Sequence, residues 1–417
     1  MNKKTQKKVK KTVKKGYNSA KKTAKKNGKL KQFYIAIVII LIIAIAAGLA
    51  YYFLVVKPNQ QNVQAFQFDT FVDIDNTGSI VEDRGKLQVH FINVDQADCT
   101  LIMLPDGRNM LIDAGDNDKP TEKHIKEYLE RFNIKTIDYM MLTHADSDHV
   151  GSMDFVLDNY EIKNIFMPKL LPTYKAGTEQ NRYSYITPDM VEGTISTKVY
   201  YDFVTRADDE TYIENGEKKD TNLFPNVDFM EIKGNDYVIE IYCMGNEMYD
   251  RKLDDSQKKN EISPTVLLKY EGRQILFTGD SCGTSHDNFV KMYRERYINT
   301  GLIKKMDFDV YKAAHHGSGT HGSNNKAFLK EIKTEYAVLS CKAGKYTGKN
   351  PIPHPTTIND LKDMKNKVYR TDICGDIKLE VENGGVIDFT ADSSTDNDTI
   401  FTKEELIEED YALPPVA

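Results

Sequence analysis

The chain has 417 residues, with 56 Lys and Arg against 62 Asp and Glu, and its charge is unevenly distributed. Fourteen lysines and no acidic residue fall in residues 1–32, which leaves 42 basic against 62 acidic residues, a balance of −20, in the rest. Such a balance argues against a protein-wide basic surface for nonspecific nucleic-acid binding, although a local basic strip is compatible with it. The five scattered cysteines do not support a disulfide framework, so we expect small, buried, apolar side chains at these positions.

The Lys-rich segment 1–32 leads directly into an uncharged, apolar segment at 33–56. Its 24 residues exceed the roughly 20 that a transmembrane helix needs. Because positive charge on one flank marks the cytoplasmic side, we predict a cytoplasmic tail, a single-pass membrane anchor and an extracellular remainder. The alternative is a cleaved signal peptide with a cut near 44–46, which would normally have a shorter apolar core of about 7–15 residues.

After the anchor, residues 57–85 are rich in Gln, Asn and Asp and predict a linker. A regular domain is expected over 86–389, and the acidic segment 390–417 is expected to be a disordered tail. Within the domain a helix is predicted at 120–132, whereas 169–260 is rich in turn signals. Apolar runs predict strands at 87–92, 100–104, 109–112, 137–142, 264–269, 274–278, 309–313, 336–340, 368–369 and 377–381. Strands and helices at this density favour a layered α/β domain.

Four potential metal ligands fall within six positions directly after the strand predicted at 137–142. They are His144, Asp146, Asp148 and His149. A turn there would give two adjacent ligand pairs that point in different directions. Imidazole plus carboxylate suits zinc, and a carboxylate-rich set also tolerates manganese or iron. The alternative is a polar loop that caps the next helix or is solvated, but four such residues at this spacing favour a metal site.

Further ligand-type residues follow two later strands at the same topological position. Asp280 ends the hairpin formed by the strands at 264–269 and 274–278, and His315 and His316 follow the strand at 309–313. A carboxylate placed there can bridge two cations, and an imidazole can complete a second site. Each feature alone would be an ordinary turn or a surface histidine pair. Their order behind the first motif makes a shared site the better interpretation.

These features together resemble the metallo-β-lactamase fold, an αββα sandwich, and within it the hydrolase domain of ComEC-type competence proteins. The resemblance covers roughly residues 87–389 and is more specific for the fold than for the substrate. The motifs that carry it are LQVHFINVDQAD at 87–98, LIDAG at 111–115, IDYMMLTHADSDHVG at 137–151, the stretch 263–280, HHGS at 315–318, and NPIPHP at 350–355 with the Thr-Asp pair at 371–372.

The resemblance implies a metallohydrolase with one or two divalent cations, Zn or Mn. Such cations lower the pKa of a bound water and stabilise charge on the reacting oxygens. Asp148 would also orient the attacking water or accept its proton, and His354 would be a proton donor, a phosphate contact or a structural residue. By position, the implied metal ligands are His144, Asp146, Asp148, His149, Asp280 as the bridging carboxylate, and His315 or His316 as the late histidine.

The chain departs from the family pattern at three points. Many members have His where this chain has Asp146, which shifts the preference toward harder metals. A histidine that usually lies between the loop and the bridging carboxylate is absent, since no His occurs between His149 and Asp280. The family's turn Gly-Gln-Gly-Asp reads Asp-Gln-Ala-Asp at 95–98 here, so the turn is altered while its Asp98 remains. The second cation would therefore be weakly held or missing.

The leading hypothesis from the sequence is a membrane-anchored, extracytoplasmic, metal-dependent phosphodiesterase. Its substrate would be DNA or a phosphodiester polymer of the cell envelope, because some relatives in this fold remove phosphorylcholine from teichoic acid. A degenerate, non-catalytic binding module is the alternative that the missing histidine motivates, and a lactonase-type hydrolase is a third. The sequence indicates no protein partner, and a single apolar span cannot form a DNA channel by itself.

Overall fold

The computed structural model describes residues 70–172, 191–192, 197–244, 256–342, 344–346 and 351–393, and four helical residues near the N-terminus. The predicted transmembrane segment 33–56 lies outside the described residues, as does nearly all of the predicted tail at 390–417. Within the described part of the chain, no helix is both long enough and apolar enough to cross a bilayer. The anchor and the tail therefore stay predictions.

Two eight-stranded sheets form the centre of the described domain. The first sheet has the order β11-β6-β5-β4-β3-β2-β19-β20, and the second has the order β1-β12-β13-β14-β15-β16-β17-β18. The strands of the first sheet are β2 (Leu87–Phe91), β3 (Thr100–Met103), β4 (Asn109–Ile112), β5 (Thr136–Met141), β6 (Glu161–Met167), β11 (Asn222–Pro225), β19 (Ile377–Val381) and β20 (Ile387–Ala391). Those of the second are β1 (Phe71–Asp75), β12 (Phe229–Lys233), β13 (Tyr237–Tyr242), β14 (Thr265–Tyr270), β15 (Arg273–Phe277), β16 (Val310–Lys312), β17 (Tyr336–Leu339) and β18 (Lys367–Arg370).

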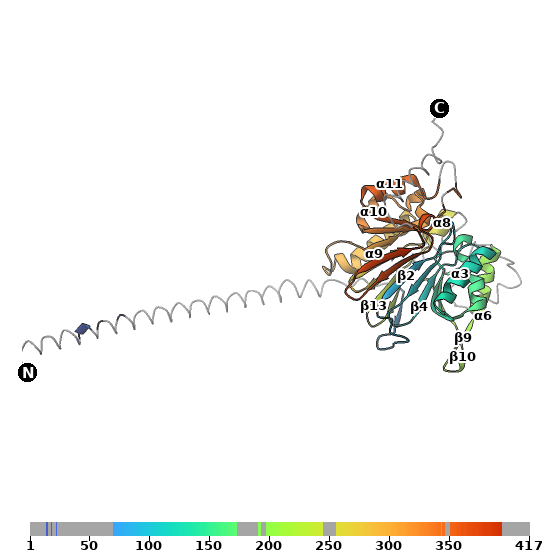
Figure 1. The fold of residues 1–417 in the computed structure, drawn as a ribbon, viewed down its shortest axis with the longest axis horizontal. Helices are drawn as coiled ribbons and strands as arrows, with labels where there is room; N and C mark the ends of the chain where they lie inside the picture. Colours follow the sequence, from blue (N-terminus) through green and yellow to red (C-terminus); the bar gives the residue numbers. More distant parts are fainter. Residues whose placement is uncertain are drawn as a thin grey trace, which may run out of the picture. The chain divides into compact units, whose positions relative to one another are not determined.

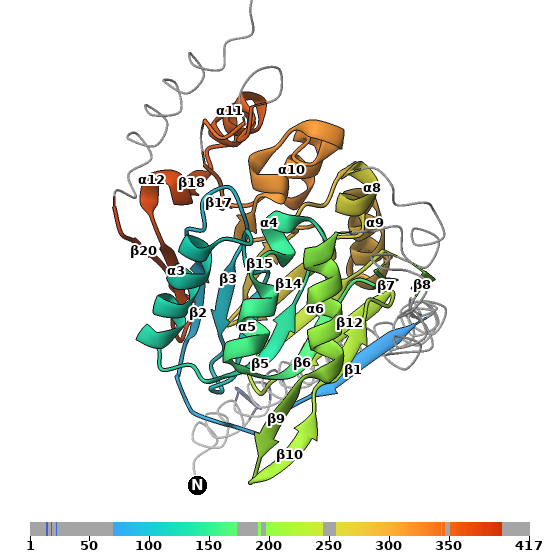
Figure 2. The same cartoon turned by 90° about the vertical axis from the view of Figure 1, so that its right-hand side faces the viewer.

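Helices cover the outer sides of both sheets, as expected for an αββα sandwich. Helices α3 (Lys119–Arg131) and α6 (Lys198–Asp209) lie on one side, and α9 (Gly283–Tyr293) and α10 (Lys326–Ile332) lie on the other (Figure 1). Figure 2 shows α3, α5 (Met153–Asn159) and α6 in front of the strands of the first sheet. The remaining short elements are α4 (Ser147–Val150), β7 (Leu170–Leu171), β8 (Val191–Glu192), β9 (Thr211–Glu214), β10 (Glu217–Asp220), α8 (Ser256–Glu261), α11 (Pro355–Asp363), α12 (Thr371–Cys374), a π-helical turn (Arg294–Ile298) and two 3₁₀ turns (Ala314–Gly317 and Thr320–Gly322).

Helix α3 shows how local sequence signals build these outer layers. Its first turn is capped by Asp118, whose Oδ1 accepts a hydrogen bond from the Thr121 amide at 2.8 Å. A proline is well tolerated at the start of the helix, because backbone amides there have no partner within the helix and proline has no N–H. The helix then packs one face on the first sheet through Ile125, Tyr128 and Leu129. This is the helix and the buried face that the sequence predicts.

The sheets enclose an apolar core that explains why most strands were predicted correctly. Strands β3 and β4 are buried at every position, which produces the continuous apolar runs seen in the sequence. Phe91 of the first sheet contacts Phe277 of the second, with ring centroids 6.2 Å apart. All five cysteines are buried and free, as expected. Each fully buried aliphatic or aromatic side chain contributes about 1.5–3 kcal/mol, so these faces hold the sandwich together.

The sequence-based expectation missed strands β6 and β20 and the strands of two longer regions. Strand β1 lies inside the segment 57–85 that was assigned to a linker, and it pairs in parallel with β12, where Phe71 stacks on Phe229 at 5.6 Å. Its side chains alternate in exposure and include two aspartates, so no continuous apolar run marks it as a strand in the sequence. The turn-rich region 169–260 also holds helix α6 and seven strands, including the charged strand β10. That strand exists because Asn215 and Gly216, both at positive φ, close a hairpin with β9.

Candidate metal centre

The predicted ligands come together because they follow strands that end at the same edge of the sandwich. In the first sheet, β4 and β5 are parallel neighbours; in the second sheet, β15 and β16 are parallel neighbours. The C-terminal ends of parallel neighbours lie side by side, and ligand sites in α/β proteins form there. The loops after β5, β15 and β16 carry all seven predicted metal ligands. These residues are connected through N–O distances of 4.0 Å or less.

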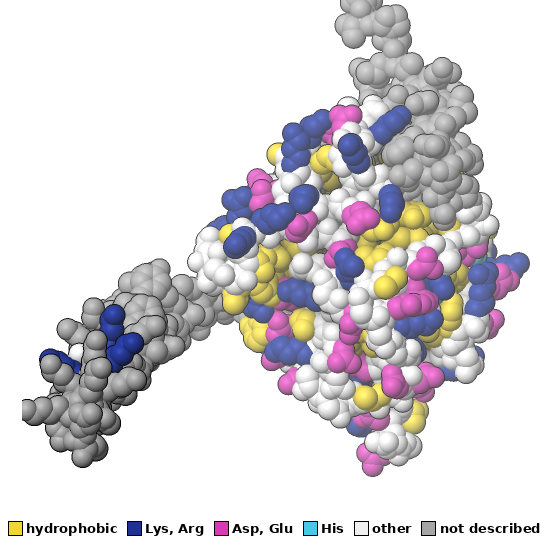
Figure 3. Space-filling model, turned by 60° about the vertical axis from the view of Figure 1, so that its left-hand side comes forward, with side chains coloured by type: hydrophobic (Ala, Val, Ile, Leu, Met, Phe, Trp, Pro, Cys, Tyr) yellow, Lys and Arg dark blue, Asp and Glu magenta, His cyan; other side chains and the backbone are white. Residues whose placement is uncertain are grey.

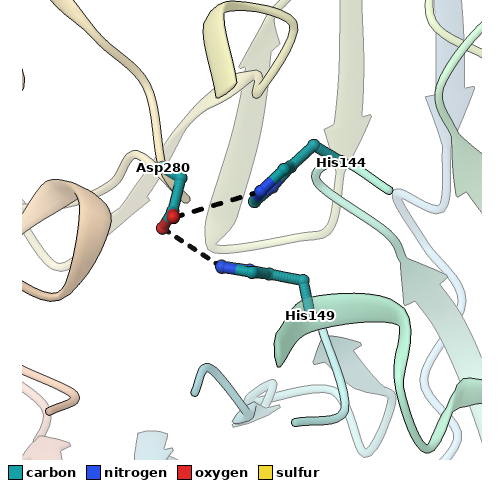
Figure 4. A group of neighbouring side chains, drawn as sticks. All are labelled: His144, His149 and Asp280. Carbon is teal, nitrogen blue, oxygen red and sulfur yellow. Dashed lines mark ion pairs between the residues drawn. The ribbon is translucent and has the colours of Figure 1, made fainter. Parts of the chain in front are cut away.

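His144, His149 and Asp280 form the centre of the cluster (Figure 4). His149 Nε2 lies 3.1 Å from Asp280 Oδ1, and His144 Nε2 lies 4.0 Å from Asp280 Oδ2. Both imidazoles are fully buried and Asp280 is 3 % exposed. Two ligands that each bind one tetrahedral cation at about 2.1 Å are about 3.4 Å apart. The observed separations lie on either side of that value, so these three side chains can share a cation.

Asp148 and His316 extend the cluster on one side. His316 Nε2 lies 3.2 Å from Asp148 Oδ2 and 3.6 Å from Asp280 Oδ2. His316 is buried, whereas the Asp148 side chain is 21 % exposed. Asp148, His149 and His316 also form a compact group of ligand atoms. Asp280 therefore stands between His144, His149 and His316, the position that the resemblance implies for a bridging carboxylate.

The unsatisfied polar atoms of the cluster fit a divalent cation. Nε2 of His144, His149 and His316 and Oδ1 of Asp280 are buried without a hydrogen-bond partner. The approach of His149 to Asp280 has the geometry of an ion pair and not of a hydrogen bond. An unsatisfied buried polar atom costs about 1–3 kcal/mol, so several converging atoms of this kind are unusual unless a ligand uses them. Imidazole nitrogen and carboxylate oxygen are donors that zinc and manganese accept.

The structure distinguishes His316 from His315. His316 Nδ1 donates to the Ser340 carbonyl at 3.0 Å, which leaves its Nε2 lone pair directed toward the cluster. His316 belongs to two compact ligand groups, whereas His315 belongs to none of the groups found among the described residues. His315 Nε2 nevertheless lies 3.6 Å from Asp280 Oδ2. The geometry thus favours His316 as the late histidine and places His315 beside it.

A strained turn presents this histidine pair. His315, His316 and Gly317 all have positive φ, at 51°, 54° and 85°. For residues other than glycine this conformation costs of order 1–3 kcal/mol and concentrates at functional sites. The His315 amide donates to the Gly279 carbonyl at 3.0 Å, which fixes the turn next to the bridging carboxylate. Two adjacent imidazoles are thereby held on the same side of Asp280.

Asp146 lies at the margin of the cluster. Its Oδ2 is 3.8 Å from His144 Nε2, and its Oδ1 is 3.4 Å from the Lys259 ammonium. The Asp146 side chain is 28 % exposed and takes part in none of the compact ligand groups among the described residues. Lys259 could not be predicted as a neighbour of Asp146, because nothing in the sequence around Lys259 indicates that helix α8 approaches the loop after β5.

Asp113 lies beside the cluster and had no role assigned to it from the sequence. It follows β4, is buried, and its Oδ2 accepts a hydrogen bond from His149 Nδ1 at 2.7 Å. Its other oxygen accepts from the Thr143 amide at 2.8 Å. A carboxylate behind a ligating histidine fixes the tautomer that leaves Nε2 free for the metal. The LIDAG motif contained the signal, since it ends a buried strand with a carboxylate at positive φ.

A buried ion pair supports His316 from behind. The Lys312 ammonium contacts Asp98 Oδ2, and both residues are at least 96 % buried. Asp98 Oδ1 lies 3.4 Å from His316 Nδ1. Asp98 was noted in the sequence only as the preserved residue of an altered turn, and Lys312 was missed. Because an unpaired buried charge is costly, the lysine keeps the carboxylate ionised at this position.

The carboxylates make the cluster a site of negative potential. Burial by itself would lower the pKa of His149, but Asp280 and Asp113 outweigh it and raise that pKa well above its usual value. Burial opposes the same effect at His316, where Asp280 and Asp98 raise the pKa to about 10. Burial would raise the pKa of Asp148, yet the close approach of His316 and His149 lowers it to about 2. Positive charge is therefore favoured at this point, and cation binding would displace protons.

His354 is placed apart from the ligand cluster. It precedes α11, its Nδ1 lies 2.9 Å from Thr356 Oγ1, and its amide donates to the Gly317 carbonyl at 2.9 Å. Among the described residues, its hydrogen bonds do not reach any of the seven predicted ligands. Its connection to the site runs through Gly317, the residue after the histidine pair. A direct catalytic role for His354 stays a prediction.

Comparison with known proteins agrees with this arrangement. Residues 92–223 match the model of the metallo-beta-lactamase superfamily. The chain is 24 % identical over 311 residues to ComE operon protein 3 of Bacillus subtilis strain 168. The aligned region covers 71 % of this chain and 33 % of that protein. The chain thus spans about a third of the length of this relative.

Two solved structures show the same kind of similarity at low sequence identity. YhfI, a metallo-beta-lactamase fold protein from Bacillus subtilis, is 9 % identical with a TM-score of 0.39, covering 72 % of this chain and 98 % of YhfI. The short form of human tRNase Z is 15 % identical with a TM-score of 0.31, covering 60 % of this chain and 91 % of that one. These TM-scores are too low to bear on activity. The match of residues 92–223 to the superfamily model, the sandwich and the cluster at its strand ends agree with the resemblance to the metallo-beta-lactamase fold and to ComEC-type proteins.

Proposed function

We propose that this chain is a metal-dependent phosphodiesterase. The observation that carries the proposal is the ligand group of Asp148, His149 and His316 around Asp280, in which buried imidazole Nε2 atoms have no hydrogen-bond partner. Three carboxylates among the seven predicted ligands favour cations that also bind phosphate oxygens, such as manganese or zinc. A divalent cation bound here would lower the pKa of a water and stabilise the negative charge of the reacting phosphate.

The side chains around the cation would then have separate tasks. Asp148 is the member of the compact groups with the greatest access to solvent, at 21 % exposure of its side chain. Its carboxylate can therefore accept a proton from an attacking water while His316 holds its orientation at 3.2 Å. Asp113 holds the His149 ring, and Asp98 with Lys312 holds the His316 ring. The ligand geometry is thus maintained by residues that do not touch the substrate.

Basic groups near the site support a phosphodiester substrate. Lys259 reaches Asp146 at 3.4 Å, and Lys345 reaches Asp116 at 3.0 Å. Next to Lys345, Tyr346 is 44 % exposed, and burial followed by the Asp148 charge raises the pKa of its phenol. Basic and acidic side chains are interspersed on the face that Figure 3 shows. Local lysines at the site, and not a broad basic surface, would attract the phosphate chain.

The site's environment is part of the same proposal. The predicted anchor at 33–56 would attach the enzyme to the cell membrane and place the hydrolase domain outside the cell. Substrates available there are DNA and the phosphodiester polymers of the envelope. DNA is the first substrate to test, because the sequence motifs resemble the hydrolase domain of ComEC-type competence proteins.

The test is hydrolysis by the purified full-length chain with manganese or zinc. Bis-p-nitrophenyl phosphate reports the reaction type, and double-stranded DNA, single-stranded DNA and teichoic acid are then compared side by side. We expect hydrolysis that depends on the added metal and that Asp148→Ala lowers by at least about a hundredfold. Metal binding without hydrolysis of any of the four would contradict the proposal and favour a binding module.

A further inference from the structure

The two halves of the ligand cluster are not equally complete. One half has Asp148, His149 and His316, whose ligand atoms lie within 4.8 Å of one another. The other half has His144 and Asp146, 3.8 Å apart, and Asp146 joins none of the compact groups among the described residues. His144 forms a compact group only with His149 and Asp280, so a cation bound there would share both of these residues with a cation in the first half.

Among the described residues, no further side chain forms a compact ligand group with His144 and Asp146. The sequence has no histidine between His149 and Asp280. His315 approaches Asp280 Oδ2 at 3.6 Å, but it forms no compact group with His144 among the described residues. Its Nε2 instead lies 3.5 Å from the Asn260 side-chain amide. When His149 and Asp280 already hold a first cation, the half around His144 therefore offers only His144 and Asp146 as further donors to a second one.

A lysine lies next to Asp146 in this half of the cluster. The Lys259 ammonium lies 3.4 Å from Asp146 Oδ1, and its side chain is 25 % exposed. Lys259 lies on α8, which Glu261 ties to the start of α9 by accepting from the Ser285 amide at 2.7 Å. Ser263, just after α8, contacts His144 Nδ1 at 3.3 Å. The helix is thus fixed over this half of the cluster, and its lysine is held near Asp146.

We propose that Lys259 supplies part of the positive charge that a second cation would otherwise bring, so the centre holds one divalent cation tightly and a second only weakly. The ammonium already neutralises the Asp146 carboxylate, and a dication beside it would be repelled. The first cation would bind at Asp148, His149, His316 and Asp280. The inference concerns the site of the proposed phosphodiesterase, but it is a statement about metal binding and requires no turnover.

The experiment is a titration of the metal-free, full-length chain with manganese alone, with free manganese measured by electron paramagnetic resonance. We expect the wild-type chain to bind about one equivalent tightly and a second at least about tenfold more weakly. Lys259→Met keeps the length of the side chain and removes its charge, so it should tighten the second equivalent by about tenfold or more. Lys259→Gln should act in the same direction.

Lys163→Met is the matched control. Lys163 is 26 % exposed and pairs with Asp138 at 2.9 Å on β5 and β6, outside the ligand cluster. It should leave both binding steps unchanged, and circular dichroism should show that every variant is folded. Two equal sites in the wild-type chain would overturn the inference, as would unchanged or weaker binding in both Lys259 variants. Tightened binding without phosphodiesterase activity would contradict only the proposed function.

Discussion

Of the clusters of buried charged residues in the described part of the chain, two make an informative pair, because only one of them has the properties of a ligand site. The ligand cluster has imidazole and carboxylate atoms that converge without hydrogen-bond partners. In the second cluster, Asp106 accepts from both Tyr237 Oη, at 3.0 Å, and Arg108 Nη1. Arg108 also donates to Ser79 Oγ at 2.9 Å. The charges of this Asp106 cluster are therefore matched by protein groups.

The difference shows that burial of charge alone does not indicate a functional site. The Asp106 cluster borders a cavity of about 260 Å³, yet its charged groups are already paired. The ligand cluster leaves donor atoms of three imidazoles unused. Native proteins satisfy nearly all buried polar atoms, so the unsatisfied set is the informative one. Substitutions in the two clusters should therefore affect different properties.

The largest effect is expected for His149→Ala, because His149 belongs to three of the four compact ligand groups. Metal content should fall below about one equivalent, and kcat/KM for bis-p-nitrophenyl phosphate should fall by about a thousandfold or more. Both are measured on the purified full-length chain, with thermal unfolding before and after added manganese. The wild-type chain should be stabilised by the metal and the variant should not. Wild-type metal content in the variant would remove the ligand assignment.

Arg108→Met should lower stability and leave metal affinity unchanged, in contrast to His149→Ala. It leaves the buried Asp106 carboxylate without its cationic partner, and breaking such a pair costs roughly 3–5 kcal/mol. Urea denaturation should show this loss of unfolding free energy. Manganese affinity, measured where the variant is folded, should equal that of the wild-type chain. A change in metal affinity would show that the two clusters are coupled and that the comparison is wrong.

Asp113→Asn tests the residue that orients His149. The amide cannot accept the Nδ1 proton of His149 as a carboxylate does, so manganese affinity should fall by about 10–100-fold. The matched control is Asp138→Asn, another buried carboxylate, which accepts from the Asn109 amide at 3.0 Å outside the ligand cluster. It should lower stability without changing metal affinity. Equal effects of the two substitutions on binding would contradict a specific role for Asp113.

Glu210 tests how partial burial of a single carboxyl affects the unfolding free energy. Burial raises the pKa of its carboxyl to about 7 from 4.5, so the neutral form is favoured in the folded chain. Its contribution to stability is present below pH 4.5 and is lost as the pH rises through 7. Glu210→Gln should therefore raise the unfolding free energy at pH 8, by less than about 1 kcal/mol because solvent screens a half-exposed group. At pH 4 the two proteins should unfold at the same urea concentration, and a difference there would contradict this cause.

Much of the fold could be predicted from local patterns, because buried strands leave continuous apolar runs. The strands β2 to β5 and β14 to β19 begin and end within two residues of their predicted positions. Strand β1 and the hairpin β9–β10 were missed because their stability comes from pairing and not from their own composition. Strand β10, with the sequence EKKD, shows how far a turn and a partner strand can override propensity.

The candidate site was predicted in part. The spacing of His144, Asp146, Asp148 and His149 indicated metal chemistry, and the positions of Asp280 and His316 after later strands indicated where further ligands would lie. The sequence left His315 and His316 as equal candidates, because adjacent residues share the same local signal. Tertiary contacts separate them, since His316 Nδ1 donates to the Ser340 carbonyl and its Nε2 lies 3.2 Å from Asp148 Oδ2. The predicted contact of His354 with the site is not seen among the hydrogen bonds that the described residues form.

The sequence by itself determined the chemical character of this protein: which side chains can bind a cation, which runs are buried, and which family pattern they match. Only the tertiary structure decided how the ligands are supported and how complete each half of the site is. Asp113, Lys312 and Lys259 act on the cluster from β4, β16 and α8, elements that are far apart in the chain. The physical reason is that ligand identity is a property of single residues, whereas orientation and charge balance depend on contacts that exist only after the two sheets have packed.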